Sequence, residues 1–140
     1  MIDVSGFRIG GLSVEMTVLL MAVILGTLHV LGQSLSSYLD RGTKWALGLR
    51  DDAPPLSISA ARIERASTNF KENFPIFIAL MLIVEVSGKA NGITQAASVI
   101  WLAARVLYYP IYALGSKLRP YIYTVSVFAV FAILFQLFTN

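Results

Sequence analysis

Two groups of polar side chains interrupt otherwise apolar stretches, and their residue types suit the binding of a small anion. The first group lies on one face of a predicted helix: Arg62, Arg65, Asn69, Glu72 and Asn73. At about 100° per residue these side chains fall within a sector of roughly 100°. Guanidinium groups match the geometry of carboxylates. This face therefore predicts a binding site for a small polyanionic molecule.

The second group shares a similarly narrow sector of another predicted helix and comprises Arg105, Tyr108, Tyr109 and Tyr112. Phenol hydroxyls can donate hydrogen bonds to an anion such as a thiolate. An ionisable side chain within a membrane helix is costly and normally faces a partner or a wet cavity. We therefore expect the two groups to partner each other, with an ion pair between Glu72 and Arg105.

A simpler interpretation is that the arginines contact lipid headgroups and the tyrosines form an interfacial belt. That interpretation explains Asn69 and Glu72 badly, because neither residue type is expected within a membrane helix without a partner or a ligand.

The elements that carry these residues are predicted to be membrane helices. The chain has 140 residues, of which 56% are hydrophobic and only 14% charged, whereas soluble domains carry about a quarter charged residues. A helix needs about 20 mainly apolar residues to cross a bilayer. We expect an all-α integral membrane four-helix bundle, with one domain over residues 1–140. The predicted helices cover about 13–38, 59–87, 94–114 and 120–138.

The second predicted helix is unusual, because its purely apolar part covers only residues 74–86 and still includes Glu85. A re-entrant segment is one explanation. A helix that starts earlier is the other, since residues 57–74 contain neither proline nor glycine and Ser57 or Ser59 could cap it. We adopt the second explanation, with a bend expected at Pro75.

Charge and residue counts limit the function and predict the topology. Most of the basic residues lie in or beside the 39–58 and 115–120 connections, so both connections are predicted to face the cytoplasm. We expect a multi-pass protein of the bacterial inner membrane, bound to membrane lipid and not to nucleic acid. The sequence has no cysteine, and His29 is the only histidine. Neither a metal site nor a cysteine nucleophile is expected.

Short links make successive helices antiparallel neighbours, so the second helix should begin at the level where the third one ends. Arg41, just after the first helix, and Arg119, just before the fourth, should lie at the same level. One pocket between four helix ends is the expected site.

Two longer motifs resemble a known family. The stretch RIERASTNFKENFPIF, residues 62–77, is similar to the second-helix signature of the membrane-associated proteins in eicosanoid and glutathione metabolism, the MAPEG family. The stretch ARVLYYPIYALGSKLR, residues 104–119, is similar to the third-helix pattern of that family. The sequence resembles a bacterial-type member related to leukotriene synthase and microsomal glutathione transferase. This resemblance implies a homotrimer with glutathione bound between adjacent subunits.

The resemblance also implies roles for individual residues. The positions that match glutathione-contacting ones are Arg62, Asn69, Glu72, Arg105, Tyr108, Tyr112 and Arg119. Arg119 and Tyr112 are assigned to the thiol, with Arg41 as an assistant. In the leukotriene-forming enzyme a second arginine follows the position of Arg41, and an aromatic residue follows that of Glu72. Gly42 and Asn73 stand there in this chain, and both departures weaken a leukotriene-forming reaction.

The function expected from the resemblance is glutathione-dependent transfer to a lipophilic small-molecule substrate, or peroxide reduction, with glutathione as co-substrate and no metal. A non-catalytic lipid-binding or adaptor protein of the same family is the alternative. A proton-coupled exporter is less favoured. It would need an essential acid near the middle of the membrane, and Glu72, which is the only plausible one, is expected to pair with an arginine.

Overall fold

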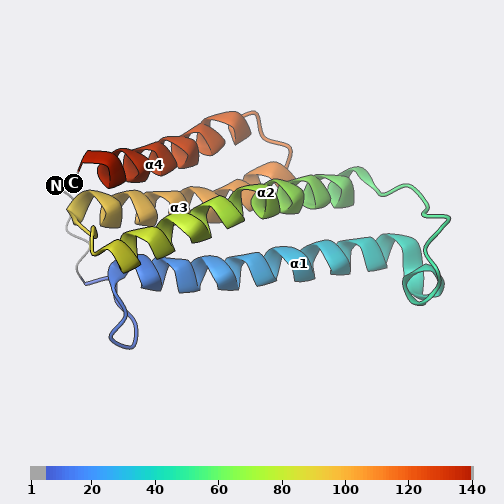
Figure 1. The fold of residues 1–140 in the computed structure, drawn as a ribbon. Helices are drawn as coiled ribbons and strands as arrows, with labels where there is room; N and C mark the ends of the chain where they lie inside the picture. The colour runs from blue at the N-terminus through green and yellow to red at the C-terminus, as the bar shows by residue number, and fades with distance from the viewer. Residues whose placement is uncertain (1–5, 140) are drawn as a thin grey trace.

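Four helices make up the part of the chain that the computed structural model describes, residues 6–139, and that part contains no strand (Figure 1). The helices are α1 (Val14–Leu47), α2 (Ile58–Ser87), α3 (Gly92–Ala113) and α4 (Arg119–Thr139). Successive helices run antiparallel (Figure 1). The expected all-α four-helix architecture is confirmed.

Polar capping residues determine where α2 and α3 begin. The Ser57 hydroxyl accepts a hydrogen bond from the backbone N–H of Ala60 at 3.3 Å, so Ser57 caps α2 as one of the two predicted candidates. Asn91 and Thr94 form a reciprocal capping box at the start of α3. At the other end of α2, Gly88 adopts a φ of +68°, which favours glycine. Because α2 begins at residue 58, its first turns are helical and present the polar face.

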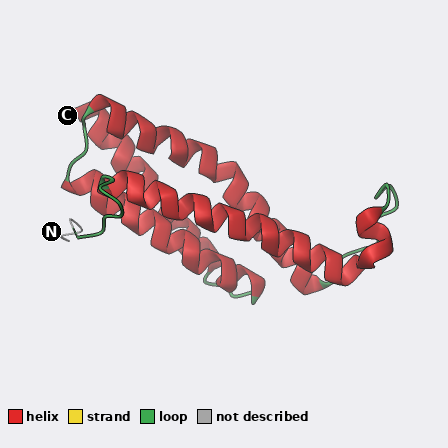
Figure 2. Ribbon diagram, turned by 90° about the horizontal axis from the view of Figure 1, so that it is seen from below, coloured by secondary structure: helices red, strands yellow, loops and turns green. Residues whose placement is uncertain are grey.

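Helix α1 is longer than predicted, because it continues past Tyr38 to Leu47. The polar residues after Tyr38 had indicated a loop, but a helix can leave the apolar layer without ending. Gly42 interrupts it with a φ of +79° and a ψ of 171°, and the last turns bend aside from the bundle (Figure 2). The backbone N–H of Ser57 donates to the Asp40 carboxylate at 2.7 Å, which ties this end of α1 to the start of α2.

The apolar faces of the helices meet in a continuous core. Its centre is a stacked pair, Phe77 on α2 and Trp101 on α3, with ring centroids 3.7 Å apart and planes at 2°. Large apolar side chains also cover the outside, including Phe128, which is 69% exposed, and Phe131, which is 61% exposed. Exposed apolar surface of this kind marks a face that meets lipid or protein.

Three of the described helices, α1, α3 and α4, are long and apolar enough to cross a membrane by length and composition. Helix α2 does not meet that measure because its first half is polar, as the sequence pattern indicated. The chain is thus a multi-pass integral membrane protein.

The order of packing leaves two free edges. Helix α1 packs against α2 and α3, and α4 packs against α3 and α2. Within residues 6–139, α1 and α4 do not contact each other. These two helices therefore form opposite edges of the bundle.

Candidate functional site

The predicted site residues gather at the end of the bundle where α2 begins, α3 ends and α4 begins, here called the basic end. One hollow there, of about 390 Å³, lies beside α2, α3 and α4. Its lining includes five predicted site residues, Asn69, Glu72, Tyr108, Tyr112 and Arg119. The structure thus brings most of the candidate set together.

A second hollow of about 410 Å³ adjoins the first and reaches the α3–α4 connection. Arg65, Tyr112 and Arg119 line both hollows, and Arg62 lines the second. We call the two together the basic hollow. Its walls present guanidinium groups next to a phenol, which is a suitable environment for carboxylates or for a thiolate.

Tyr112 lies at the centre of the basic hollow, between two guanidinium groups. The Cζ atom of Arg119 is 4.7 Å from the Tyr112 ring centroid, and that of Arg65 is 6.0 Å away. The Tyr108 ring meets Tyr112 edge-on, with centroids 5.5 Å apart. Both tyrosines are buried, whereas Arg65 and Arg119 are exposed. The rings are thus fixed by packing, and the cations stay accessible to a ligand.

Arg105 is buried beneath the basic hollow and is only 2% exposed. Its Nη1 donates a hydrogen bond of 2.8 Å to Oδ1 of Asn69. Its Cζ also lies 5.4 Å from the Trp101 ring centroid and 5.3 Å from that of Tyr123, distances typical of cation–π contacts. Asn69 and aromatic rings therefore surround the charge.

The predicted ion pair between Glu72 and Arg105 is wrong for the described protomer. Among residues 6–139 neither side chain forms an ion pair, and Glu72 is exposed. The reason is helix register, since α2 and α3 run antiparallel and Asn69, one turn before Glu72, lies opposite Arg105. The Glu72 carboxylate is left free at the surface of the hollow.

Arg62 lies against the turn that follows α3. A Cβ atom added to Gly115 would meet Cζ, Nη1 and Nη2 of Arg62. Gly115 also has a φ of +73°, a conformation that L side chains rarely adopt. Glycine at this position thus permits both the turn and the close approach of the guanidinium.

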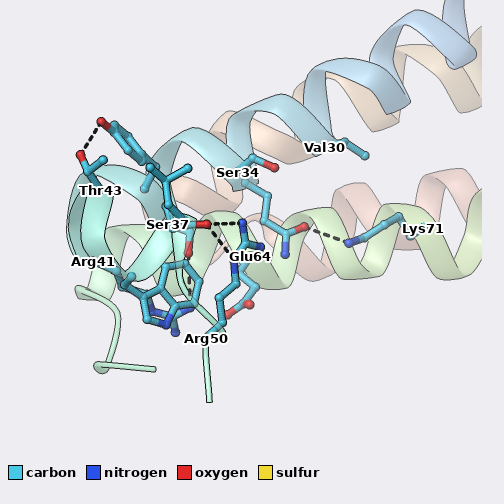
Figure 3. Close-up of a pocket in the computed structure, with 13 residues that line it drawn as sticks. Val30, Ser34, Ser37, Arg41, Thr43, Arg50, Glu64 and Lys71 are labelled. Atoms are coloured by element: carbon cyan, nitrogen blue, oxygen red, sulfur yellow. Dashed lines mark hydrogen bonds between the residues drawn. The ribbon is translucent and has the colours of Figure 1, made fainter. Parts of the chain in front are cut away.

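Arg41 lies elsewhere. It lines a groove of about 730 Å³ along α1 and α2 (Figure 3), and neither part of the basic hollow includes it. Its Nε donates to the carbonyl of Pro54 at 2.8 Å, and its Nη1 to the Ser37 hydroxyl at 3.3 Å. The guanidinium Cζ also lies 4.4 Å from the Trp45 ring centroid. Within one protomer the structure does not bring Arg41 to Tyr112 and Arg119.

Arg65 is a site residue that the candidate set missed, although the sequence pattern placed it on the polar face of α2. It lines both parts of the basic hollow. Its spacing could have identified it, because Arg65, Asn69 and Glu72 stand at i, i+4 and i+7, which is one helical stripe. Gly115 was also missed, and its role depends on a φ angle that the sequence does not display.

His29 is engaged with its neighbours in the core. Its Nδ1 lies 3.3 Å from the Ser67 hydroxyl, which is 3.2 Å from the His29 carbonyl. Its ring stacks on Phe70 with centroids 4.5 Å apart. His29 on α1 thus contacts two residues of α2. The described residues contain no group of three or more metal-ligating side chains.

Comparison with known proteins identifies the family of this chain. A family model described as the MAPEG family matches residues 18–139, a range that contains all of the residues of the basic hollow. No curated protein and no solved structure matches the chain significantly. On the strength of this match over nearly the whole chain, the protein belongs to the MAPEG family.

Proposed function

We propose that this protein binds glutathione in the basic hollow and uses its thiolate on a lipophilic electrophile, as a transferase or a peroxidase. The observation that carries the proposal is the convergence of Arg65, Arg119 and Tyr112 on one accessible hollow. Within residues 6–139 neither arginine has a carboxylate partner. Unpaired guanidinium groups that meet in one hollow suit a ligand with more than one negative charge.

The lining of the basic hollow matches the functional groups of glutathione. Arg62 and Arg65 suit its two carboxylates, because guanidinium forks bind carboxylates through paired hydrogen bonds. The free Glu72 carboxylate suits its ammonium group. The family's use of glutathione makes this tripeptide the preferred ligand among small polyanions.

We assign the thiol to the Arg119 and Tyr112 side of the hollow. A thiol with a pKa of about 8.5 is only a few per cent ionised at pH 7, and nearby cations lower that pKa. The thiol proton leaves to solvent, and the thiolate remains beside the guanidinium and the phenol hydroxyl. In the transferase reaction the sulfur forms a bond to an electrophilic carbon. In a substitution the bond from that carbon to the leaving group breaks, and the leaving group departs with the electron pair. In an addition the electron pair of the broken bond stays on the substrate and takes up a proton from solvent.

In the peroxidase reaction the thiolate attacks the peroxide, and the O–O bond breaks to give an alcohol and a glutathione sulfenic acid. A second glutathione then displaces water to form the disulfide. Both reactions need the same stabilised thiolate, so the basic hollow serves either one.

A second copy of the chain is proposed to complete the site. The groove that holds Arg41 carries polar side chains of α1 along the membrane span, including Gln33, Ser34 and Ser37. Polar groups are costly against lipid, so a partner subunit is the preferred cover. Since α1 and α4 form opposite edges, a homotrimer would bring Arg41 of one subunit toward the basic hollow of the next.

Calorimetric titration of the detergent-solubilised protein with glutathione tests the binding, and ultraviolet absorbance of the bound thiolate tests its ionisation. We expect Arg119→Gln to raise the pKa of bound glutathione by about one unit. Arg8→Gln is a matched control, because Arg8 is exposed and lines neither part of the basic hollow. If the wild type binds no glutathione, the proposal fails. Binding without turnover of any electrophile would favour the non-catalytic member of the family.

A further inference from the structure

The contact between Arg105 and Asn69 fixes which end of the Asn69 amide faces the ligand. Arg105 Nη1 lies 2.8 Å from Asn69 Oδ1. A guanidinium has five donors and no acceptor, so only the oxygen of the amide can face it favourably. The amide nitrogen, Nδ2, must therefore point the other way.

The position of Asn69 directs that nitrogen toward the basic hollow. Asn69 lines the hollow and is half-buried, whereas Arg105 lines neither part of it. Among residues 6–139 no acceptor is bonded to Asn69 Nδ2. An Nδ2 group at the wall of a hollow, with no acceptor of its own, is available to an oxygen of a bound molecule.

Arg105 itself is locked in place. Three ring faces surround its guanidinium, with Cζ 5.4 Å from the Trp101 centroid, 5.9 Å from Tyr108 and 5.3 Å from Tyr123. A buried side chain packed in this way has little freedom to turn toward a ligand. It can still hold the oxygen of Asn69 in one orientation.

We propose that Arg105 is a positioning residue and not a ligand-binding one. It makes Asn69 an obligatory hydrogen-bond donor in the basic hollow, so that the site prefers a ligand oxygen, from a carboxylate or an amide carbonyl, at that point. This inference rests on the proposed function for the identity of the ligand. It also changes the role that the family resemblance implied for Arg105.

The test compares Asn69→Asp with Asn69→Leu in the full-length protein in detergent. Aspartate keeps an oxygen for Arg105 but has no donor for the ligand, and leucine removes both. We expect Asn69→Asp to retain the melting temperature of the ligand-free protein and to bind glutathione about tenfold more weakly. Asn69→Leu should lose both stability and affinity. Arg105→Lys should recover part of the affinity that Arg105→Met loses, because an ammonium group can also hold the Asn69 oxygen.

The two kinds of failure are distinguishable. Full glutathione affinity in Asn69→Asp would overturn the donor role, because a purely structural contact predicts that outcome. A melting temperature as low as that of Asn69→Leu would overturn the pairing with Arg105. If the wild type binds no glutathione, the proposed function fails, and the ligand-free melting temperatures alone then decide whether Arg105 holds Asn69.

Discussion

Replacement of Gly115 by alanine should weaken ligand binding through Arg62, because the new Cβ would take the space that the Arg62 guanidinium occupies. Two effects follow from the structure. Gly115 has a φ of +73°, and an L residue in the left-handed region costs about 1–2 kcal/mol. The new Cβ would also meet the Arg62 guanidinium. Because that group is the far end of a flexible side chain, we expect it to move aside at little cost in stability.

The size of the binding effect follows from what Arg62 contributes. A charge-assisted hydrogen bond contributes about 1.5–3 kcal/mol, and the half-buried position of Arg62 favours the low end. Displacement of the guanidinium should then weaken glutathione binding roughly tenfold, since about 1.4 kcal/mol corresponds to a factor of ten. Unfolding should become easier by about 1 kcal/mol from the backbone effect. Calorimetry measures the binding, and thermal unfolding in detergent measures the stability.

Making Gly115→Ala in a protein that already lacks the Arg62 guanidinium separates the effect on binding from the effect on stability. In an Arg62→Met protein, Gly115→Ala should still lower stability but should not weaken binding further. Gly115→Asn is a second control, because asparagine tolerates the left-handed region better than alanine but also carries a Cβ. If Gly115→Ala weakens binding equally in both backgrounds, the effect does not pass through Arg62 and the reasoning is refuted.

Two further predictions concern the assembly and its orientation. Mass measurement of the solubilised protein should give three subunits, and a monomeric protein that retains full glutathione affinity would contradict the shared site. Single cysteines at Asp52 and Ala90, both exposed and outside helices, should label differently in intact cells: the one at Asp52 is expected to resist impermeant reagents and the one at Ala90 to react. Labelling in the opposite sense would reverse the topology.

Local sequence features predicted those parts of the fold that local chemistry determines. The start of α2 followed from a cap residue and from a stretch without glycine or proline, and Ser57 is the observed cap. The shared face of Arg65, Asn69 and Glu72 followed from helical periodicity alone. The far end of α1 was not predictable in the same way, because the polar residues after Tyr38 are equally compatible with a loop and with a helix outside the membrane.

Contacts between helices were harder to predict, because they depend on the relative rotation and register of the helices. The sequence predicted that Arg41 and Arg119 lie at the same depth along the bundle axis. Residues at one depth can still lie on different sides of the bundle. Arg41 lies on the α1 side of α2, and Arg119 lies beside α3 and α4. Residues on a helix rise by about 1.5 Å each, so a register shift of one turn is enough to exchange Glu72 for Asn69 as the partner of Arg105.

This exchange changes the expected behaviour of Glu72→Gln and Arg105→Met. A paired arrangement would make the double mutant lose clearly less stability than the sum of the single mutants. In the observed arrangement Glu72 is exposed and Arg105 is bonded to Asn69. We therefore expect Glu72→Gln to leave the melting temperature nearly unchanged and Arg105→Met to lower it. The stability losses should add within about 0.5 kcal/mol.

The same pair of variants also reports on the assembly. A non-additive loss of stability in the ligand-free protein would mean that Glu72 meets a guanidinium after all. Within one protomer the register excludes that contact, so the guanidinium would belong to a neighbouring subunit. Repeating the cycle at detergent concentrations that dissociate the oligomer decides the point. Coupling that disappears with dissociation places the ion pair between subunits, whereas coupling that persists in the monomer contradicts the register of α2 and α3 described above.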